Sequence, residues 1–396
     1  MTYGHSKGRR RRCAIGLITS VSVVTLLAAC SSAKSSSSGA TDEATGSAAA
    51  SIAPFTQQVS AFEKGSPASF GGPQTAPAIP KNINLWVISC DASDSGCQEP
   101  AEDAATAAKF LGWKVTVFNG NSDPTTENAG VLDAIADRAN AIILITINPL
   151  VIQQGLREAA SAGVKVVSVS GGTGSPNPPS AAPKYTPAVD VSVNYPAVGT
   201  AVAAAVIANS GGKADVWIQS DKASPVIAIT QNAILAELAK CSGCKVEQPI
   251  FYFTSDDIAT TLGQETVGYL EAHPNVNYII VPFDPAAVAE VTAIRSAGLA
   301  NRVKIVSVVG AAQNLNFIRT GDIQFADVAE DSDYLGYAGV DQTIRLLDGA
   351  PVITPNNEDA PLALLEKSNL PTDGQEWAPS FNAPAMYEQL WKTGHA

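Results

Sequence analysis

The chain has 396 residues, of which 16% are charged, and its 37 acidic residues outnumber its 25 basic ones to give a net charge of −12. A surface of that sign repels phosphate backbones and anionic lipid, which argues against a nucleic-acid partner and against electrostatic adhesion to a membrane. The length leaves room for about two domains once the low-complexity amino terminus is set aside.

The amino terminus has the pattern of an export signal. Arg9 to Arg12 form a basic run, residues 14–29 form an apolar stretch too short for a typical membrane span, and Leu27-Ala28-Ala29-Cys30 ends it with small residues before a cysteine. This pattern resembles a bacterial lipoprotein signal peptide over residues 1–29. The resemblance implies lipidation of Cys30 and a lipid-anchored location on the extracytoplasmic side of the cell membrane. An ordinary signal peptide that contains a cysteine by chance is the alternative.

Two low-complexity segments follow the signal. Removing residues 1–29 leaves 20 basic and 37 acidic residues, or −17, so the acyl chain must provide the anchoring. Residues 30–51 are rich in Ser, Ala, Gly and Thr, which predicts a flexible tether. Residues 52–80 place a few large apolar side chains among prolines, which predicts a short element or an extended arm lying on the body.

From Lys81 onward, short β-branched runs alternate with longer stretches that have apolar residues at helical spacing. The runs are nearly all apolar, as expected for parallel strands covered on both faces. Helices are expected at 99–112, 125–138, 149–163, 224–239, 256–272 and 285–297. Strands are expected first at 83–89, 114–118, 141–146, 164–169 and 189–193, and again at 214–219, 250–253, 277–282, 303–308 and 323–328.

This pattern predicts an α/β fold with two doubly wound parallel-sheet lobes and a cleft between them. Right-handed crossovers place the loops after the strand carboxyl ends on one edge of each sheet, which is the edge where open α/β sheets bind ligands. Two lobes that face each other along those edges would enclose a small molecule.

Several stretches resemble a known family, among them "REAASAGVKVVSVS", "VNYPAVGTAVAAAVI", "EAHPNVNYIIVPFDPAAVAEVTAIRSAG" and "SNLPTDGQEWAPSFNAPAMYEQLWK". Over Lys81 to Trp391 the chain is similar to the type I periplasmic binding proteins, the sugar-type solute receptors of ATP-driven importers. The resemblance implies a monomeric receptor whose chain crosses three times between its lobes and which hands a small solute to an ABC permease. It also implies a first lobe of 81–194 plus about 331–350, and a second lobe of 195–330 plus about 351–396.

The sequence departs from this family at several ligand positions. Ser170-Gly171 stands where the sugar receptors carry an Asp-Arg pair, and Gly310-Ala311-Ala312 lacks the usual carboxylate. Asp284 matches a family aspartate, whereas Glu330 stands where a glutamine is common. These exchanges leave the expected fold in place and remove the expectation of an ordinary pentose or hexose.

Residues at the strand ends are the candidates for ligand contact. Acids outnumber bases among them, and only Asp221 has a neighbouring cation, Lys222. Unpaired acids in a closed cleft would favour a cationic or hydroxyl-rich solute. A helix cap or a solvated loop is the alternative role for each acid, and a cap above all for Asp284. The candidates are Asp91, Glu99, Thr146, Asn148, Ser170, Asn194, Tyr195, Gln219, Asp221, Tyr252, Phe283, Asp284, Gln313 and Glu330.

Four cysteines follow Cys30, namely Cys90, Cys97, Cys241 and Cys244, and outside the cytoplasm they are expected to oxidise. Three pairings are possible, and the two local pairs are the economical choice because the two segments belong to different lobes. A zinc site lacks histidines to complete it, and a Cys-x-x-Cys redox centre at 241–244 remains an alternative. We interpret Cys90–Cys97 as a disulfide that closes the first binding loop.

The sequence predicts a binding protein and not an enzyme. A reaction would need a nucleophile or an acid–base group with a partner, and no such arrangement, no phosphate loop with its lysine, no cofactor motif and no metal site is visible. The expected function is that of a solute-binding lipoprotein of an ABC importer. The alternative is a sensor that presents its closed form to a chemoreceptor or a kinase.

Overall fold

The computed structural model describes residues 42–172, 184–222, 224–353, 358 and 360–394. The signal peptide predicted for residues 1–29, the lipidation site Cys30 and residues 30–41 of the tether lie outside this range. The chain divides into two units, Met1–Glu43 and Ala44–Ala396, and the two lobes both belong to the second unit. Of the helices in the described part of the chain, none has the length and apolar character that crossing a bilayer requires.

Helix α1 (Asp42–Phe62) begins inside the segment predicted as a flexible tether, so that prediction is corrected for residues 42–51. Alanine-rich sequence favours a helix, and Phe55 and Val59, one turn apart, are buried and hold its second half. The chain then runs on as an arm along the body, as one of the two sequence alternatives has it. Ser66 pairs with Leu362 of the second lobe in an isolated antiparallel bridge.

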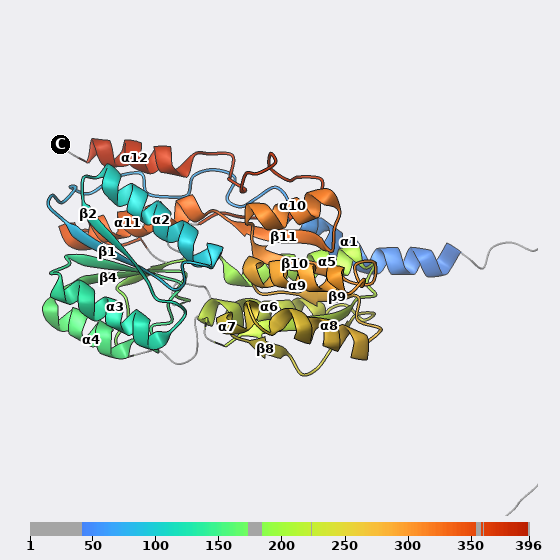
Figure 1. Cartoon of the computed structure of the whole chain (residues 1–396). Coiled ribbons are helices and arrows are strands. Elements are labelled where there is room, and N and C mark those ends of the chain that lie inside the picture. Colours follow the sequence, from blue (N-terminus) through green and yellow to red (C-terminus); the bar gives the residue numbers. More distant parts are fainter. Residues whose placement is uncertain (1–41, 173–183, 223, 354–357, 359, 395–396) are drawn as a thin grey trace, which may run out of the picture. The chain divides into compact units, whose positions relative to one another are not determined.

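The first lobe is built on a five-stranded parallel sheet in the order β2-β1-β3-β4-β5. The strands alternate with helices, as the sequence predicts, and the central strand is buried along its whole length. Helices α3 and α4 pack together on one face and α2 and α11 on the other (Figure 1). The elements are β1 (Asn84–Ser89), α2 (Ser95–Phe110), β2 (Lys114–Asn119), α3 (Pro124–Ala136), β3 (Ala141–Ile145), α4 (Gln153–Ala162), β4 (Lys165–Val169) and β5 (Val189–Val191).

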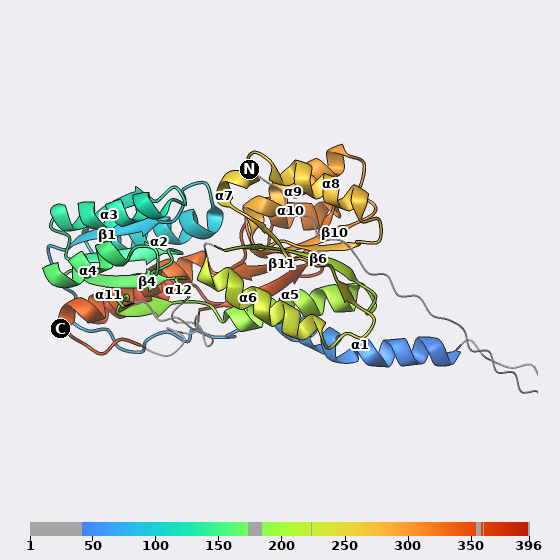
Figure 2. The same ribbon diagram turned by 90° about the horizontal axis from the view of Figure 1, so that it is seen from below.

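The second lobe has a seven-stranded sheet in which β12-β11-β10-β9-β6-β7 run side by side and β8 pairs with β6. Figure 2 shows α5 and α6 on one face of this sheet and α8, α9 and α10 on the other. The elements are α5 (Tyr195–Asn209), β6 (Asp215–Asp221), α6 (Pro225–Leu238), β7 (Lys245–Val246), β8 (Phe251–Phe253), α7 (Ser255–Ile258), α8 (Leu262–Ala272), β9 (Tyr278–Ile280), α9 (Asp284–Ser296), β10 (Lys304–Val309), α10 (Ala312–Thr320), β11 (Gln324–Glu330) and β12 (Leu362–Glu366).

Helix α11 (Ser332–Asp348) packs on the first sheet and on α2, as predicted for the returning helix. The predicted second-lobe segment 351–396 needs a correction, because only its first part belongs there. Strand β12 pairs antiparallel with β11, but α12 (Ala383–Thr393) packs on α11 and α2 of the first lobe. The reason is an aromatic contact, in which Trp391 stacks parallel to Tyr337 with ring centroids 5.7 Å apart.

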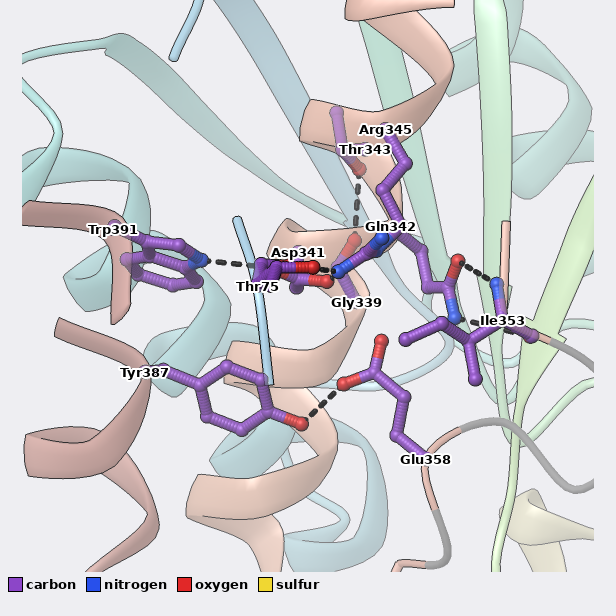
Figure 3. A network of polar contacts seen from close by, with 10 residues as sticks. All are labelled: Thr75, Gly339, Asp341, Gln342, Thr343, Arg345, Ile353, Glu358, Tyr387 and Trp391. Atoms are coloured by element: carbon purple, nitrogen blue, oxygen red, sulfur yellow. Dashed lines mark hydrogen bonds and ion pairs between the residues drawn. The ribbon is translucent and has the colours of Figure 1, made fainter. Parts of the chain in front are cut away.

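A buried polar cluster fastens the last crossover to the first lobe (Figure 3). Asp341 of α11 accepts from the Nε–H of Arg345 (2.7 Å) and from the Nε1–H of Trp391 (2.9 Å). The hydroxyl of Tyr387 on α12 donates to the carboxylate of Glu358, which lies in the crossover. Burial and the nearby Asp341 raise the pKa of Glu358 well above its ordinary value. The guanidinium of Arg345 thus forms its ion pair with Asp341, and its charge only partly offsets the rise in the pKa of Glu358.

Candidate ligand-binding cleft

A cavity of about 330 Å³ lies where the carboxyl ends of the two sheets meet. Its wall on the first lobe consists of Cys90, Asp94, Gly96, Cys97, Ser122, Pro124, Glu127, Thr146, Asn148, Val151 and Ser170. The rest of the wall consists of Tyr195 at the crossover and of Asp221, Lys222, Ser224, Val226, Ile227, Thr230, Thr254, Ser255, Pro282, Phe283, Val308, Val309 and Glu330. This is the edge at which the topology of both sheets predicts a ligand.

Unusual backbone angles are concentrated along this wall. Of the eight non-glycine residues with positive φ in the described ranges, four line the cavity. They are Ser122 (φ 52°), Thr146 (φ 55°), Ser170 (φ 56°) and Val309 (φ 116°), which all lie at or just beyond strand ends. For a β-branched residue such as Val309 this conformation is strained. The strain is the cost of turning the chain sharply so that these residues face the cavity.

The first binding loop is held by its own side chains. Asp94 caps helix α2 by accepting from the N–H of Gly96 at 2.9 Å, and the hydroxyl of Ser89 donates to the carbonyl of Cys97 at 3.1 Å. Cys90 and Cys97 form a disulfide with their Cα atoms 5.6 Å apart, which is the local pairing that the sequence favours. The loop therefore enters the wall in one conformation.

The second cysteine pair lies away from the cavity. Cys241 and Cys244 are joined with their Cα atoms 5.4 Å apart, just after the carboxyl end of α6, and neither belongs to the cavity wall. In the described part of the chain, no group of three or more His, Cys, Asp or Glu side chains is arranged to hold a metal ion.

The cavity wall is rich in carboxylates. Burial raises the pKa of Asp94 to about 6, that of Glu127 to about 7 and that of Glu330 to about 8, and neighbouring acids add to each shift. Lys222 is the one cation among the wall residues that the structure describes, and its ammonium lies 4.6 Å from the centre of the Tyr252 ring. An empty cavity of this kind holds bound protons at neutral pH.

Seven of the residues predicted from the sequence reach the cavity wall, although their contact with a ligand stays a prediction. They are Thr146, Asn148, Ser170, Tyr195, Asp221, Phe283 and Glu330. Sequence reasoning missed Asp94 and Glu127. Asp94 is the N-cap of α2 and Glu127 lies in the first turn of α3, and an acid at the start of a helix is ordinarily explained by helix capping or by the helix dipole.

The prediction that Asp284 contacts the ligand is corrected. The structure places its side chain in the core of the second lobe and not in the cavity wall. Its carboxylate accepts from the N–H groups of Gly310 (3.0 Å) and Ala311 (2.7 Å) and from the hydroxyl of Ser307. Burial and the adjacent Asp327 raise its pKa well above the ordinary value. Asp284 therefore supports the loop that follows β10. Val309, the last residue of β10, lines the cavity.

Two further candidates are buried or used in secondary structure. The amide of Gln219 donates to the carboxylate of Glu290 in the core of the second lobe. Asn194 caps helix α5 through the N–H of Ala197 at 3.2 Å. Neither side chain belongs to the cavity wall, and each has a hydrogen-bond partner inside its own lobe.

The remaining candidates lie beside the cavity or away from it. Asp91 accepts from the hydroxyl of Ser122 at 3.0 Å and so steadies a wall residue without lining the wall itself. Glu99 lies on α2 outside the wall, Gln313 is exposed on α10, and Tyr252 is 41% exposed beneath the Lys222 ammonium.

A comparison with protein families shows the family to which the chain belongs. Residues 86–351 match the model described as the periplasmic binding protein domain. The chain belongs to the periplasmic binding protein family. This confirms the resemblance stated from the sequence and, together with the two lobes, the predicted fold class. No curated protein matches the chain.

Solved structures with this fold include solute-binding proteins of ABC transporters. One from Agrobacterium vitis, bound with α-D-tagatopyranose, has a TM-score of 0.65 at 18% identity and covers 74% of this chain and 97% of its own. One from Mycobacterium smegmatis, with bound glycerol, has a TM-score of 0.63 at 19% identity, with coverages of 73% and 95%. The 5-methylthioribose transporter protein from Thermotoga lettingae has a TM-score of 0.62 at 16% identity, with coverages of 80% and 99%. The family model describes a binding domain, and these neighbours are named as transporter solute-binding proteins, in agreement with the sequence prediction of a binding protein.

Proposed function

We propose that this protein is the solute-binding lipoprotein of an ABC-type importer, and that it binds a small polar solute in the cavity and delivers it to a membrane permease. The observation that carries the proposal is a single cavity whose walls come from the strand ends of both sheets, in a chain of the periplasmic binding protein family. Its volume of about 330 Å³ falls at the lower end of small-molecule sites.

The chemistry of the wall agrees with a hydroxylated solute. Hydroxyl side chains from both lobes are both donors and acceptors, as sugar and polyol hydroxyls are. Apolar groups such as Val226, Val308 and Phe283 can cover the C–H faces of the same molecule. The solved neighbours that hold tagatopyranose and glycerol bind molecules of this class, which supports extending that class to this protein.

Binding between the lobes would also be the signal to the permease. A solute that contacts both walls stabilises the arrangement in which the lobes approach each other, because it has more contacts there than in an open state. The crossovers at residues 192–194 and 331 and the segment after α11 are the connections that would bend. A lipid on Cys30 would hold this receptor near the permease, with residues 31–41 as the connection.

A thermal-shift screen of the mature chain against sugars, polyols, amines and nucleosides tests the binding step. A solute present at about 100 times its dissociation constant adds about 2.7 kcal/mol of stability, which raises the melting temperature by several degrees. The solute found in this way is then supplied, radiolabelled, to cells that lack the gene.

Restoring the wild-type gene should restore uptake, and Cys30→Ser should release the protein into the medium and reduce uptake. Uptake that does not depend on the gene would contradict the importer role. If the cells instead lose a response to the solute, the sensing alternative gains support.

A further inference from the structure

We propose that the solute carries a positively charged amine and that Glu127 is the carboxylate that receives it on the first-lobe side of the cavity. The inference rests on the proposed function and specifies the chemical class of its solute. It goes beyond the neutral sugars and polyols named for the solved neighbours.

Glu127 has the geometry of a binding group that lacks its partner. It lines the cavity, its side chain is only 6% exposed, and no described residue forms a hydrogen bond or an ion pair with its carboxylate. A buried carboxylate without a partner is costly, so it is retained where a ligand supplies the partner. The neighbouring acid Asp123, at the N-cap of the same helix, already accepts from the N–H groups of Thr125 and Thr126 and is partly exposed. Helix capping therefore does not occupy Glu127.

The chain makes room for this side chain. A Cβ atom added at Gly120 would lie 2.7 Å from Cγ of Glu127 and 2.9 Å from the carbonyl oxygen of Ser89. Only glycine at position 120 lets Glu127 lie across the end of strand β1 and reach the cavity. Its place in the first turn of α3 also favours a negative charge, because the helix dipole is positive at that end.

The charges around Glu127 point to a cation and not to an anion. Among the wall residues that the structure describes, three other acids, Asp94, Asp221 and Glu330, stand against the single ammonium of Lys222. None of the ion pairs between described residues includes Asp94, Glu127 or Glu330. An ammonium group placed among them would satisfy several acceptors at once.

Proton linkage distinguishes this solute from a neutral one. The pKa values of Glu127 and Glu330, raised by burial to about 7 and about 8, mean that the empty cavity keeps protons at neutral pH. A cation favours the ionised carboxylates, so its binding releases protons and tightens as the pH rises. A neutral polyol covers the same groups without charge, so its binding takes up protons or leaves them unchanged.

The test uses matched pairs that differ by one amino group: D-glucosamine and D-glucose, D-galactosamine and D-galactose, 1-amino-1-deoxysorbitol and sorbitol, and 3-amino-1,2-propanediol and glycerol. Binding to the mature chain is measured by titration calorimetry between about pH 5.5 and 8, in buffers with different ionisation enthalpies. In at least one pair we expect the amine to bind about tenfold or more tightly than its hydroxyl partner at pH 7.5, with net proton release.

Glu127→Gln should reduce the preference for the amine over its hydroxyl partner by a factor of about ten or more. It should not lower the melting temperature of the empty protein at pH 7.5. Glu265→Gln, an exposed exchange on α8, is the matched control and should leave the preference unchanged. An amine preference that survives in Glu127→Gln overturns the role of Glu127.

If no amine in the panel binds better than its hydroxyl partner, the proposal is overturned, and this includes the case in which nothing binds. Tight binding of a neutral partner alone would also overturn the proposal of an amine solute, but it would leave the proposed receptor function intact.

Discussion

Asp284 provides a sharp test of how the cavity wall is supported, because two substitutions at this position should have very different effects. Its side chain is fully buried at the start of α9. One carboxylate oxygen accepts from the N–H groups of both Gly310 and Ala311, and the other accepts from the hydroxyl of Ser307. Asp284→Ala would leave one buried and one partly buried backbone donor without partners, together with a small cavity.

The expected cost follows from these contacts. An unsatisfied buried donor costs about 1–3 kcal/mol, so Asp284→Ala should lower the free energy of unfolding by about 3–5 kcal/mol. In Asp284→Asn the amide oxygen can keep both N–H partners while the amide nitrogen donates to Ser307. Because the pKa of Asp284 is raised well above its ordinary value, the neutral asparagine resembles the native protonation state. We expect Asp284→Asn to lie within about 1 kcal/mol of the wild type.

Urea unfolding at pH 7, followed by tryptophan fluorescence and circular dichroism, measures both values, and equal m-values would show that the unfolded states are comparable. Solute affinity should fall in the alanine variant as well, because the loop after Val309 would lose its support. The reasoning fails if Asp284→Ala costs less than about 1 kcal/mol, or if the asparagine variant is as unstable as the alanine variant.

Three further predictions concern the buried carboxyl group of Glu290, the first binding loop and the buried polar cluster of Figure 3. Burial raises the pKa of Glu290 to about 7, so the native state keeps a proton that the unfolded state releases, and stability should fall as the pH rises from about 4.5 to 7. The free energy of unfolding of Glu290→Gln should therefore exceed that of the wild type by an amount on the order of 3 kcal/mol at pH 8 and by less than about 1 kcal/mol at pH 5, and an advantage independent of pH would contradict this. Replacing Cys90 and Cys97 by serine should lower the free energy of unfolding by about 2–3 kcal/mol and weaken solute binding, as measured by calorimetry. Unchanged affinity would show that the binding loop does not need the disulfide. Trp391→Phe keeps an aromatic ring on α12 but removes the donor to Asp341, so thermal unfolding should show a loss of about 1–3 kcal/mol, and a loss near zero would mean that the cluster does not depend on this bond.

Much of the fold could be predicted because parallel strands that are buried on both faces appear in the sequence as short apolar runs. The run at 141–146 was therefore predictable as a strand, and it forms the fully buried β3. Strand β12 was missed, since its residues 362–366 are an isolated run whose antiparallel partner lies more than thirty residues earlier. The lobe to which α12 belongs was mistaken for a similar reason, because the stacking of Trp391 on Tyr337 is a tertiary contact that no local pattern reveals.

The residues of the candidate site were predictable where the strand topology alone determines their position. Ser170 and Glu330 end parallel strands, and the crossover rule brings both to the cavity. The rule does not say where a side chain at the start of a helix points. Asp284 turns inward to bind a loop, whereas Glu127 lines the cavity and packs against Gly120, where a Cβ atom would collide with it.

A crystal structure of the mature chain with the tightest-binding solute tests the central claim most directly. The account predicts that the solute lies in the cavity between the strand ends and contacts side chains of both lobes, with Glu127 on one side and Phe283 or Glu330 on the other. A solute bound elsewhere on the surface, or one held by a single lobe while the strand ends of the other face away, would contradict it.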